Sequence, residues 1–181
     1  MEYGFEKMII LGIDPGIATV GWGVVSLDKG SFRYIDCGTI RTPSGMRVER
    51  RLYLIHMALC DIIKRYTPDE ISIEELFFNN NQKTVINVAQ ARGVILFCAE
   101  EHRIPVFEYT PLQVKQAMVG YGRAEKKQVM EMTRVFLKLD SHPKPDDAAD
   151  ALALSICHGH TRGSKMRGLT TIKYSKKTGG N

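Results

Sequence analysis

An apolar segment that ends in an acidic residue, MIILGID at 8–14, constrains the fold more than any other feature of this chain. A short apolar run of this kind predicts a strand buried in the middle of a sheet. Two segments with strand character follow, at 19–27 and 31–40, and the residues LDKGS between them favour a tight turn. Together the three segments predict an antiparallel meander.

The rest of the chain alternates helical and strand patterns. Between 46 and 66, apolar residues recur every three or four positions, which predicts an amphipathic helix. The other predicted elements are strands at 69–76 and 105–110 and helices at about 83–102, from Pro111, from Ala124 and from near Asp146. This order predicts an α/β fold in one domain, with a five-stranded mixed sheet flanked by helices.

The ends of the chain differ from its middle. The tail at 161–181 has six basic residues and no acidic one, so the positive charge of the chain is concentrated there. We expect this tail to be flexible and to favour polyanions such as nucleic acid, or else only to aid solubility. Residues 1–7 are interpreted as an extension without the pattern of a secretory signal. No apolar run approaches the roughly 18 residues of a membrane span, and we expect a cytoplasmic protein.

The cysteines are widely spaced, lie in apolar contexts and form no C-x-x-C pair. We therefore expect thiols in the core rather than disulfides or a zinc site. The CHGH motif gives His158 and His160 only a weak resemblance to a metal-binding pattern. The four cysteines are Cys37, Cys60, Cys98 and Cys157.

Three aspartates open the last helix, in the sequence PKPDDAADALALS. Carboxylates at this position can accept hydrogen bonds from free backbone N–H groups, and Asp146 is best explained as such a cap. Asp147 and Asp150 are three residues apart, so they share one face of the helix. Two carboxylates on one face can also hold a hard divalent cation.

Two further acids can reach the same point. Asp14 closes the first strand and Glu74 lies in the fourth, and these strands can be neighbours in a sheet of this order. Alone, Asp14 could belong to a turn and Glu74 could be an edge-strand charge. Four converging carboxylates repel one another unless cations bind, and two Mg²⁺ ions roughly 3.5–4 Å apart would suit such a site. Such a pair hydrolyses phosphodiesters.

Several motifs in the same order carry a family resemblance. They are ILGIDPG with GWGV, ISIEELFF, AQARGV, PVFEYTPLQVKQAMVGYGRAEK and DAADALALS. Over about residues 8–160 the chain resembles the RuvC family of bacterial Holliday-junction resolvases. The resemblance implies a ribonuclease-H-like fold, a homodimer, and Mg²⁺- or Mn²⁺-dependent cutting of four-way DNA junctions. It also suggests work beside the RuvA and RuvB branch-migration machinery.

The resemblance assigns roles to the acids. It implies that Asp14, Glu74 (rather than Glu75), Asp147 and Asp150 are catalytic and hold the metal ions. Some relatives have a histidine at the position of Asp147, so this residue is implied to be either a ligand or a general base.

The resemblance also implies DNA contacts. Lys115 and Lys126 match family lysines that lie near the scissile phosphate or hold the DNA backbone, and Lys127 is a weaker neighbour. Phe77 aligns with an aromatic residue that wedges into the junction, and Phe78 is the next candidate. The alternatives are solvated helix surface for the lysines and core positions for the phenylalanines.

A four-way junction has approximate two-fold symmetry, so a two-fold dimer would present two matched sites. The helix NQKTVINVAQARGVILFCA is apolar nearly all round, which suits burial by its own sheet and by a partner. Three other functions compete with junction cleavage. They are a junction-binding module without cleavage, an actin-like phosphotransferase, for which 181 residues are too few, and a ribonuclease H.

Overall fold

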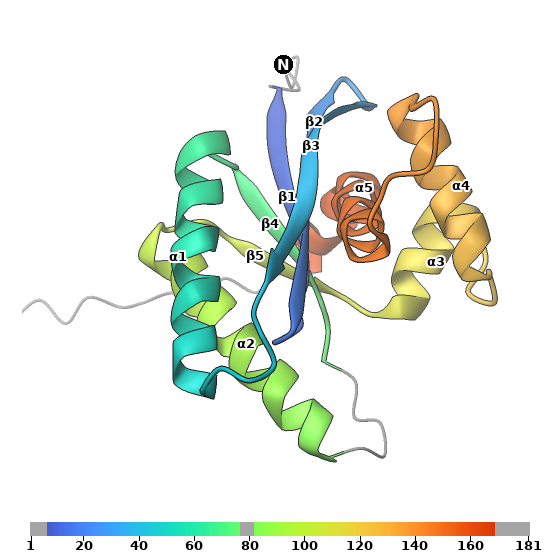
Figure 1. Cartoon of the computed structure of the whole chain (residues 1–181). Helices are drawn as coiled ribbons and strands as arrows, with labels where there is room; N and C mark the ends of the chain where they lie inside the picture. Colours follow the sequence, from blue (N-terminus) through green and yellow to red (C-terminus); the bar gives the residue numbers. More distant parts are fainter. Residues whose placement is uncertain (1–6, 77–81, 169–181) are drawn as a thin grey trace, which may run out of the picture.

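A five-stranded sheet lies between two layers of helices (Figure 1). The computed structural model describes residues 7–76 and 82–168. Helices α1 and α2 cover one face of the sheet, and α5 covers the other with α3 and α4 outside it (Figure 1). The elements are β1 (Met8–Asp14), β2 (Thr19–Asp28), β3 (Ser31–Arg41), α1 (Val48–Tyr66), β4 (Glu70–Glu74), α2 (Gln82–Glu101), β5 (Val106–Tyr109), α3 (Pro111–Val119), α4 (Lys126–Leu137) and α5 (Asp146–Gly168).

The strand order is β3-β2-β1-β4-β5. The first three strands form the predicted antiparallel meander, whereas β4 runs parallel to β1 and β5 runs parallel to β4. The prediction of a five-stranded mixed sheet flanked by helices is therefore confirmed. Because β1 and β4 are parallel neighbours, the acids at their ends lie at the same edge of the sheet.

Alternation along β1 assigns its side chains to the two faces. Leu11 and Ile13 are fully buried in the core beneath α1 and α2, and Ile10 is buried in the second core beneath α5. Successive side chains of a strand point to opposite faces, so Gly12 and Asp14 share the α5 face with Ile10. The same alternation along β4 gives Glu74 the α5 face and Glu75 the opposite one.

Helix α5 lies unusually close to β1 and β2 because both strands have glycines beneath it. A Cβ on Gly12 would lie 1.9 Å from the carbonyl oxygen of Ala151, and a Cβ on Gly23 would lie 2.7 Å from Leu152. A glycine inside a strand often marks such an approach by another backbone. Most of α5 is buried as a result: every residue from Ala148 to His158 is buried except Asp150, whose side chain is partly exposed.

Helix α5 extends further than the sequence indicates. The predicted tail begins at residue 161, but the helix continues to Gly168. Thr161 donates a hydrogen bond to the carbonyl of Cys157, and Arg162 donates two to Glu70, at 2.8 and 2.9 Å. The bonds of Arg162 to Glu70 of β4, with a further one from Thr161 to the hydroxyl of Tyr109 in β5, anchor the longer helix to the sheet. The N-terminal residues 1–6 and the rest of the tail, 169–181, lie outside the described residues.

The cysteines and histidines of the sequence analysis have clear locations. All four cysteines lie within the described residues and none of them forms a disulfide; Cys37 is half-buried and the others are buried. His158 is fully buried, and its two ring nitrogens contact Tyr109 and Glu70 at 2.7 and 2.5 Å. The ring of His160 packs edge-on against Phe32. Structural contacts therefore account for both histidines of CHGH.

Candidate active site

The strand ends bring Asp14 and Glu74 together. Ile13 of β1 pairs with Ile73 of β4, so the next residues in register are Asp14 and Glu74. The carboxyl groups of Asp14 and Glu74 lie close enough that each acts on the ionisation of the other. The predicted convergence of these two acids agrees with this geometry.

The first turns of α5 supply the other two acids. Gly21 lies opposite Asp14 in the β1–β2 pair, and a Cβ on Gly21 would lie 2.0 Å from the carbonyl oxygen of Asp147. The start of α5 is thus in backbone contact with the strand beside Asp14. Charges on both Asp147 and Asp150 are close enough to act on the ionisation of Asp14.

The electrostatics of the site are those of crowded carboxylates. Burial, the charges of Glu74, Asp150 and Asp147, and the hydrogen bond with Glu74 raise the pKa of Asp14 to about 8. Burial also raises the pKa of Glu74, and the charge of Asp150 adds to this. Like charges in a partly desolvated site disfavour ionisation. A bound cation would reverse this effect.

The donor set fits a hard divalent cation. All four groups are carboxylates, and oxygen ligands of this kind suit Mg²⁺, Mn²⁺ or Ca²⁺ rather than a soft ion. Burial, and then the repulsion between neighbouring carboxylates, raise the pKa of Asp14, and such an ion would remove the repulsion. The four residues that could hold it come from β1, β4 and α5.

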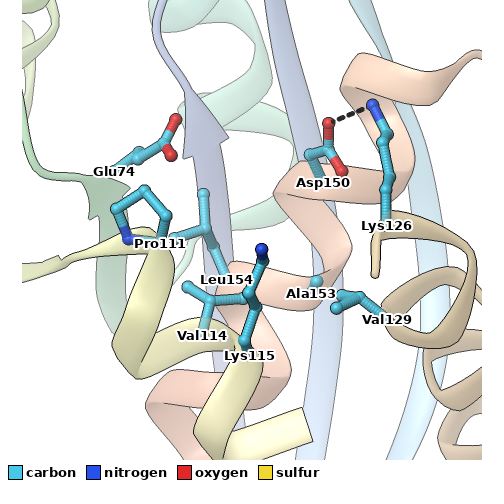
Figure 2. A pocket seen from close by; sticks show the side chains of 9 residues that line it. All are labelled: Glu74, Pro111, Val114, Lys115, Lys126, Val129, Asp150, Ala153 and Leu154. Carbon is cyan, nitrogen blue, oxygen red and sulfur yellow. Dashed lines mark hydrogen bonds and ion pairs between the residues drawn. The ribbon is translucent and has the colours of Figure 1, made fainter. Parts of the chain in front are cut away.

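A cavity of about 190 Å³ beside the acids contains two of the predicted lysines (Figure 2). Lys126 Nζ lies 2.9 Å from a carboxylate oxygen of Asp150 and 3.5 Å from Asp146. Lys115 lines the cavity between Glu74 and Asp150 (Figure 2). The structure therefore brings together acids for a cation and ammonium groups for a phosphate.

Local sequence signals position both lysines. Helix α3 begins with a capping box between Thr110 and Gln113 that includes Pro111 in its first turn, and Lys115 follows one turn later. Helix α4 begins at Lys126, directly after the N-cap residue Glu125, whose backbone N–H donates a hydrogen bond to the side chain of Gln128 at 2.8 Å.

Other predicted residues lie elsewhere. Lys127 is exposed and is absent from the cavity lining, so the structure does not bring it to the acids. Phe77 and Phe78 lie outside the described residues. Asp146, predicted as a helix cap, lies in the first turn of α5, where its carboxylate contacts Lys126.

Some contributors were missed by sequence reasoning. Gly12, Gly21 and Gly23 allow the close approach of α5, and Val114 and Val129 form apolar walls of the cavity. The glycines did leave a signal, since GWG interrupts a β-branched strand, but that pattern does not say which element approaches. The valines look like ordinary helix core positions.

The sequence matches the family described as Crossover junction endodeoxyribonuclease RuvC over residues 10–158. The chain belongs to the RuvC family. The RuvC protein of Clostridioides difficile (strain 630) is 55% identical over 154 residues, which cover 85% of this chain and 91% of the relative. The RuvC protein of Halothermothrix orenii is 53% identical over 154 residues, with 85% and 93% covered. The RuvC family comprises metal-dependent nucleases that hydrolyse phosphodiester bonds.

Solved structures agree with the RuvC assignment. Thermus thermophilus RuvC in complex with a Holliday-junction substrate matches with a TM-score of 0.84 and 34% identity, covering 87% of this chain and 96% of that one. The yeast mitochondrial resolvase Ydc2 matches with a TM-score of 0.62 and 12% identity, which shows a shared fold alone. The ribonuclease-H-like fold implied by the family resemblance is confirmed. Across residues 7–76 and 82–168, no helix is both long and apolar enough to cross a membrane.

Proposed function

We propose that this chain resolves four-way DNA junctions by paired, symmetric nicks in homologous recombination and repair. The observation that carries the proposal is the meeting of four carboxylates from β1, β4 and α5, two of which, Glu74 and Asp150, line one cavity with two lysines. Membership of the RuvC family and the likeness to a junction-bound RuvC structure support the substrate.

We assign the carboxylates of Asp14, Glu74, Asp147 and Asp150 to two Mg²⁺ ions, with Mn²⁺ able to substitute. When bound, such ions supply an activated water and stabilise the leaving oxygen of the phosphodiester. The carboxylates hold this charge at the edge of the sheet because three packed elements fix their positions. Asp147 serves either as a ligand or as the base that takes a proton from water.

The lysines orient the phosphate. Lys126 pairs with Asp150, and its ammonium group would also be able to bind a phosphate oxygen if that carboxylate held a cation. Lys115 extends into the same cavity, whose apolar walls at Val114 and Val129 limit water around the reacting group (Figure 2). Lys127 would contribute only general attraction to the DNA backbone.

The partners follow from symmetry and surface. A two-fold dimer supplies two equivalent sites for the two cuts. Helix α2 exposes Ile86 and Phe97, each by more than half, which suits a partner on this helix. Phe77 and Phe78 remain candidates for stacking on an unstacked base, which is worth roughly 1–3 kcal/mol. Contact with RuvA and RuvB rests on family membership.

The test is cleavage of a synthetic four-way junction in Mg²⁺, beside linear duplex of the same sequence. Paired symmetric nicks on the junction alone, abolished by Asp14→Asn, are expected. Junction binding without nicks in both Mg²⁺ and Mn²⁺ would favour a binding module. Equal cutting of linear duplex would keep the nuclease and reject the junction specificity.

A further inference from the structure

A second group of metal-binding side chains lies between α1 and α2, on the face of the sheet opposite α5 (Figure 1). His56 and Cys60 come from α1, and Cys98 and Glu101 come from α2. One ligand atom from each residue lies within 4.8 Å of the others. Such a mixture of sulfur, nitrogen and oxygen donors differs in kind from the carboxylates of the active site.

The distances between the ligand atoms are close to those around a single small ion: two of the four given below lie within the range for tetrahedral Zn²⁺, and the other two differ from it by about 0.2–0.3 Å. Cys60 Sγ lies 3.3 Å from Cys98 Sγ and 3.6 Å from His56 Nε2. The carboxylate of Glu101 lies 3.0 Å from His56 Nε2 and 4.0 Å from Cys60 Sγ. Ligands around a tetrahedral Zn²⁺ are separated by roughly 3.3–3.8 Å, given Zn–S near 2.3 Å and Zn–N or Zn–O near 2.0 Å.

The helical spacing explains why these atoms meet. His56 and Cys60 are four residues apart on α1, and Cys98 and Glu101 are three apart on α2, so each pair lies on one helix face. The two pairs face each other where α1 packs against α2. Each helix therefore offers two ligands in a geometry that its own backbone fixes.

The two cysteines of the group are buried, whereas the histidine and the glutamate are partly exposed to solvent. Cys98 is fully buried and Cys60 is 6% exposed, among the apolar side chains beneath the two helices. The side chains of His56 and Glu101 are 25% and 47% exposed, so an ion can enter from solvent. The ring of His102 contacts the carbonyl of Cys98 at 2.9 Å, so it packs against the last turn of α2 next to the group.

We propose that His56, Cys60, Cys98 and Glu101 bind one Zn²⁺ ion, which joins α1 to α2. Two thiolates and an imidazole favour zinc over Mg²⁺, so the two metal sites of the chain select different ions. Binding releases the two thiol protons to solvent and forms two Zn–S bonds, with no oxidation. The ion has a structural role, because four protein ligands leave no open position.

The site would fix the helix that leaves the active site. Glu74 ends β4, and α2 begins at Gln82, only a short segment later. Helix α1 lies over the sheet, so a metal link between the two helices holds α2 at its C-terminal end. This role does not depend on cleavage, and its test needs no DNA.

The full chain is stripped of metal by a chelator under reducing conditions and titrated with Co²⁺, then with Zn²⁺. One equivalent of Co²⁺ should produce the strong visible and thiolate charge-transfer absorption of a tetrahedral thiolate site, and Zn²⁺ should abolish it. Oxygen ligands at the active site produce no thiolate band, so the two sites are separated in one spectrum. Absence of the band at saturating Co²⁺ would overturn the proposal.

Variants assign the ligands. Cys60→Ser and Cys98→Ser should lose the band, whereas Cys157→Ser, a buried thiol in the other core, should keep it. If the first two fail to fold, His56→Ala and Glu101→Gln test the more exposed ligands and should weaken Zn²⁺ binding by roughly 100-fold. A band that survives in Cys60→Ser, or unchanged Zn²⁺ affinity in His56→Ala, would show that these residues are not the ligands.

Discussion

Gly21 lies directly opposite Asp14 in the β1–β2 pair, and the backbone of Asp147 occupies the space that a side chain at Gly21 would need. One glycine thus lies between a carboxylate on the sheet and a carboxylate on α5. Its lack of a side chain, rather than any property of the acids themselves, allows the two to approach.

Replacing this glycine should separate the acids. Gly21→Ala would place a methyl group 2.0 Å from the carbonyl oxygen of Asp147, so α5 must move. We expect a loss of about 1–3 kcal/mol in the free energy of unfolding and a large loss of junction cleavage. Gly45→Ala is the matched control, since nothing lies within 4 Å of a Cβ there. Equal activity of the two variants would contradict the close-approach argument.

Removing one carboxylate should stabilise the metal-free protein. Burial and neighbouring acids raise the pKa of Asp14 from 3.8 to about 8, so the folded state binds this proton more tightly than the unfolded state. The contribution of protonated Asp14 to the free energy of unfolding is therefore fully present below about pH 4. It is lost as the pH rises toward and through 8. Asp14→Asn should raise the free energy of unfolding in EDTA near pH 8, on the order of 1–3 kcal/mol.

Urea denaturation in EDTA and in Mg²⁺ tests this prediction. Mg²⁺ should stabilise the unmodified chain more than Asp14→Asn, because the ion relieves a repulsion that the variant lacks. A variant that is less stable than the unmodified chain in EDTA would show that Asp14 is held by favourable contacts instead.

Glu70, the buried acid at the other end of β4, should contribute to the free energy of unfolding with the opposite pH dependence to that of Asp14. Burial alone would raise the pKa of Glu70, but hydrogen bonds with His158 and Arg162 lower it below its ordinary value. The stability from this group is present above about pH 4.5 and is lost as the pH falls through the lower folded pKa. Glu70→Gln should cost on the order of 2 kcal/mol at neutral pH and flatten the acid limb.

Glu131→Gln is the control for this experiment. Glu131 pairs with Arg134 and His142 at the surface, where salt and water weaken the interaction. Thermal unfolding between about pH 3 and pH 7 should leave this variant close to the unmodified chain. A larger effect at Glu131 than at Glu70 would refute the assignment of acid sensitivity to the buried network.

The two neighbouring lysines of α4 should differ in their effect on cleavage. Lys126 contacts Asp150 and lines the cavity, whereas Lys127 is exposed outside it. Lys126→Ala should lower the single-turnover cleavage rate by roughly 10- to 100-fold, as expected for lost charge stabilisation at the phosphate. Lys127→Ala should weaken junction binding slightly and leave that rate unchanged. Similar rates for both variants would place Lys126 outside the reaction.

Much of this fold was predictable because its elements carry local signals. The apolar run at 8–14, the helical periodicity of 46–66 and the capping pattern around Pro111 each reflect a physical preference of the chain at that point. The structure reproduces all five strands and five helices of the prediction, with boundaries shifted by a few residues. The convergence of Asp14 with Glu74 followed from strand order alone.

What escaped prediction depends on contacts between distant segments. The extension of α5 to Gly168 depends on Arg162 meeting Glu70, ninety-two residues earlier in the chain. The cysteines predicted as separate core thiols include two, Cys60 and Cys98, that lie 3.3 Å apart across a helix pair. The sequence pattern of one helix or strand contains no information on such contacts, because the contacts form only when distant elements pack together.

The place of α5 after β1 and β4 in the chain has a consequence during synthesis. Residues emerge from the ribosome in order, so β1 and β4, with Asp14 and Glu74, are available long before Asp147 and Asp150. An unfinished chain holds half of the carboxylates and lacks the helix that covers that face of the sheet. On the proposed assignment of the four carboxylates to the active site, a nascent polypeptide with this sequence is expected to cut nucleic acid only after α5 has been made and has packed onto the glycines.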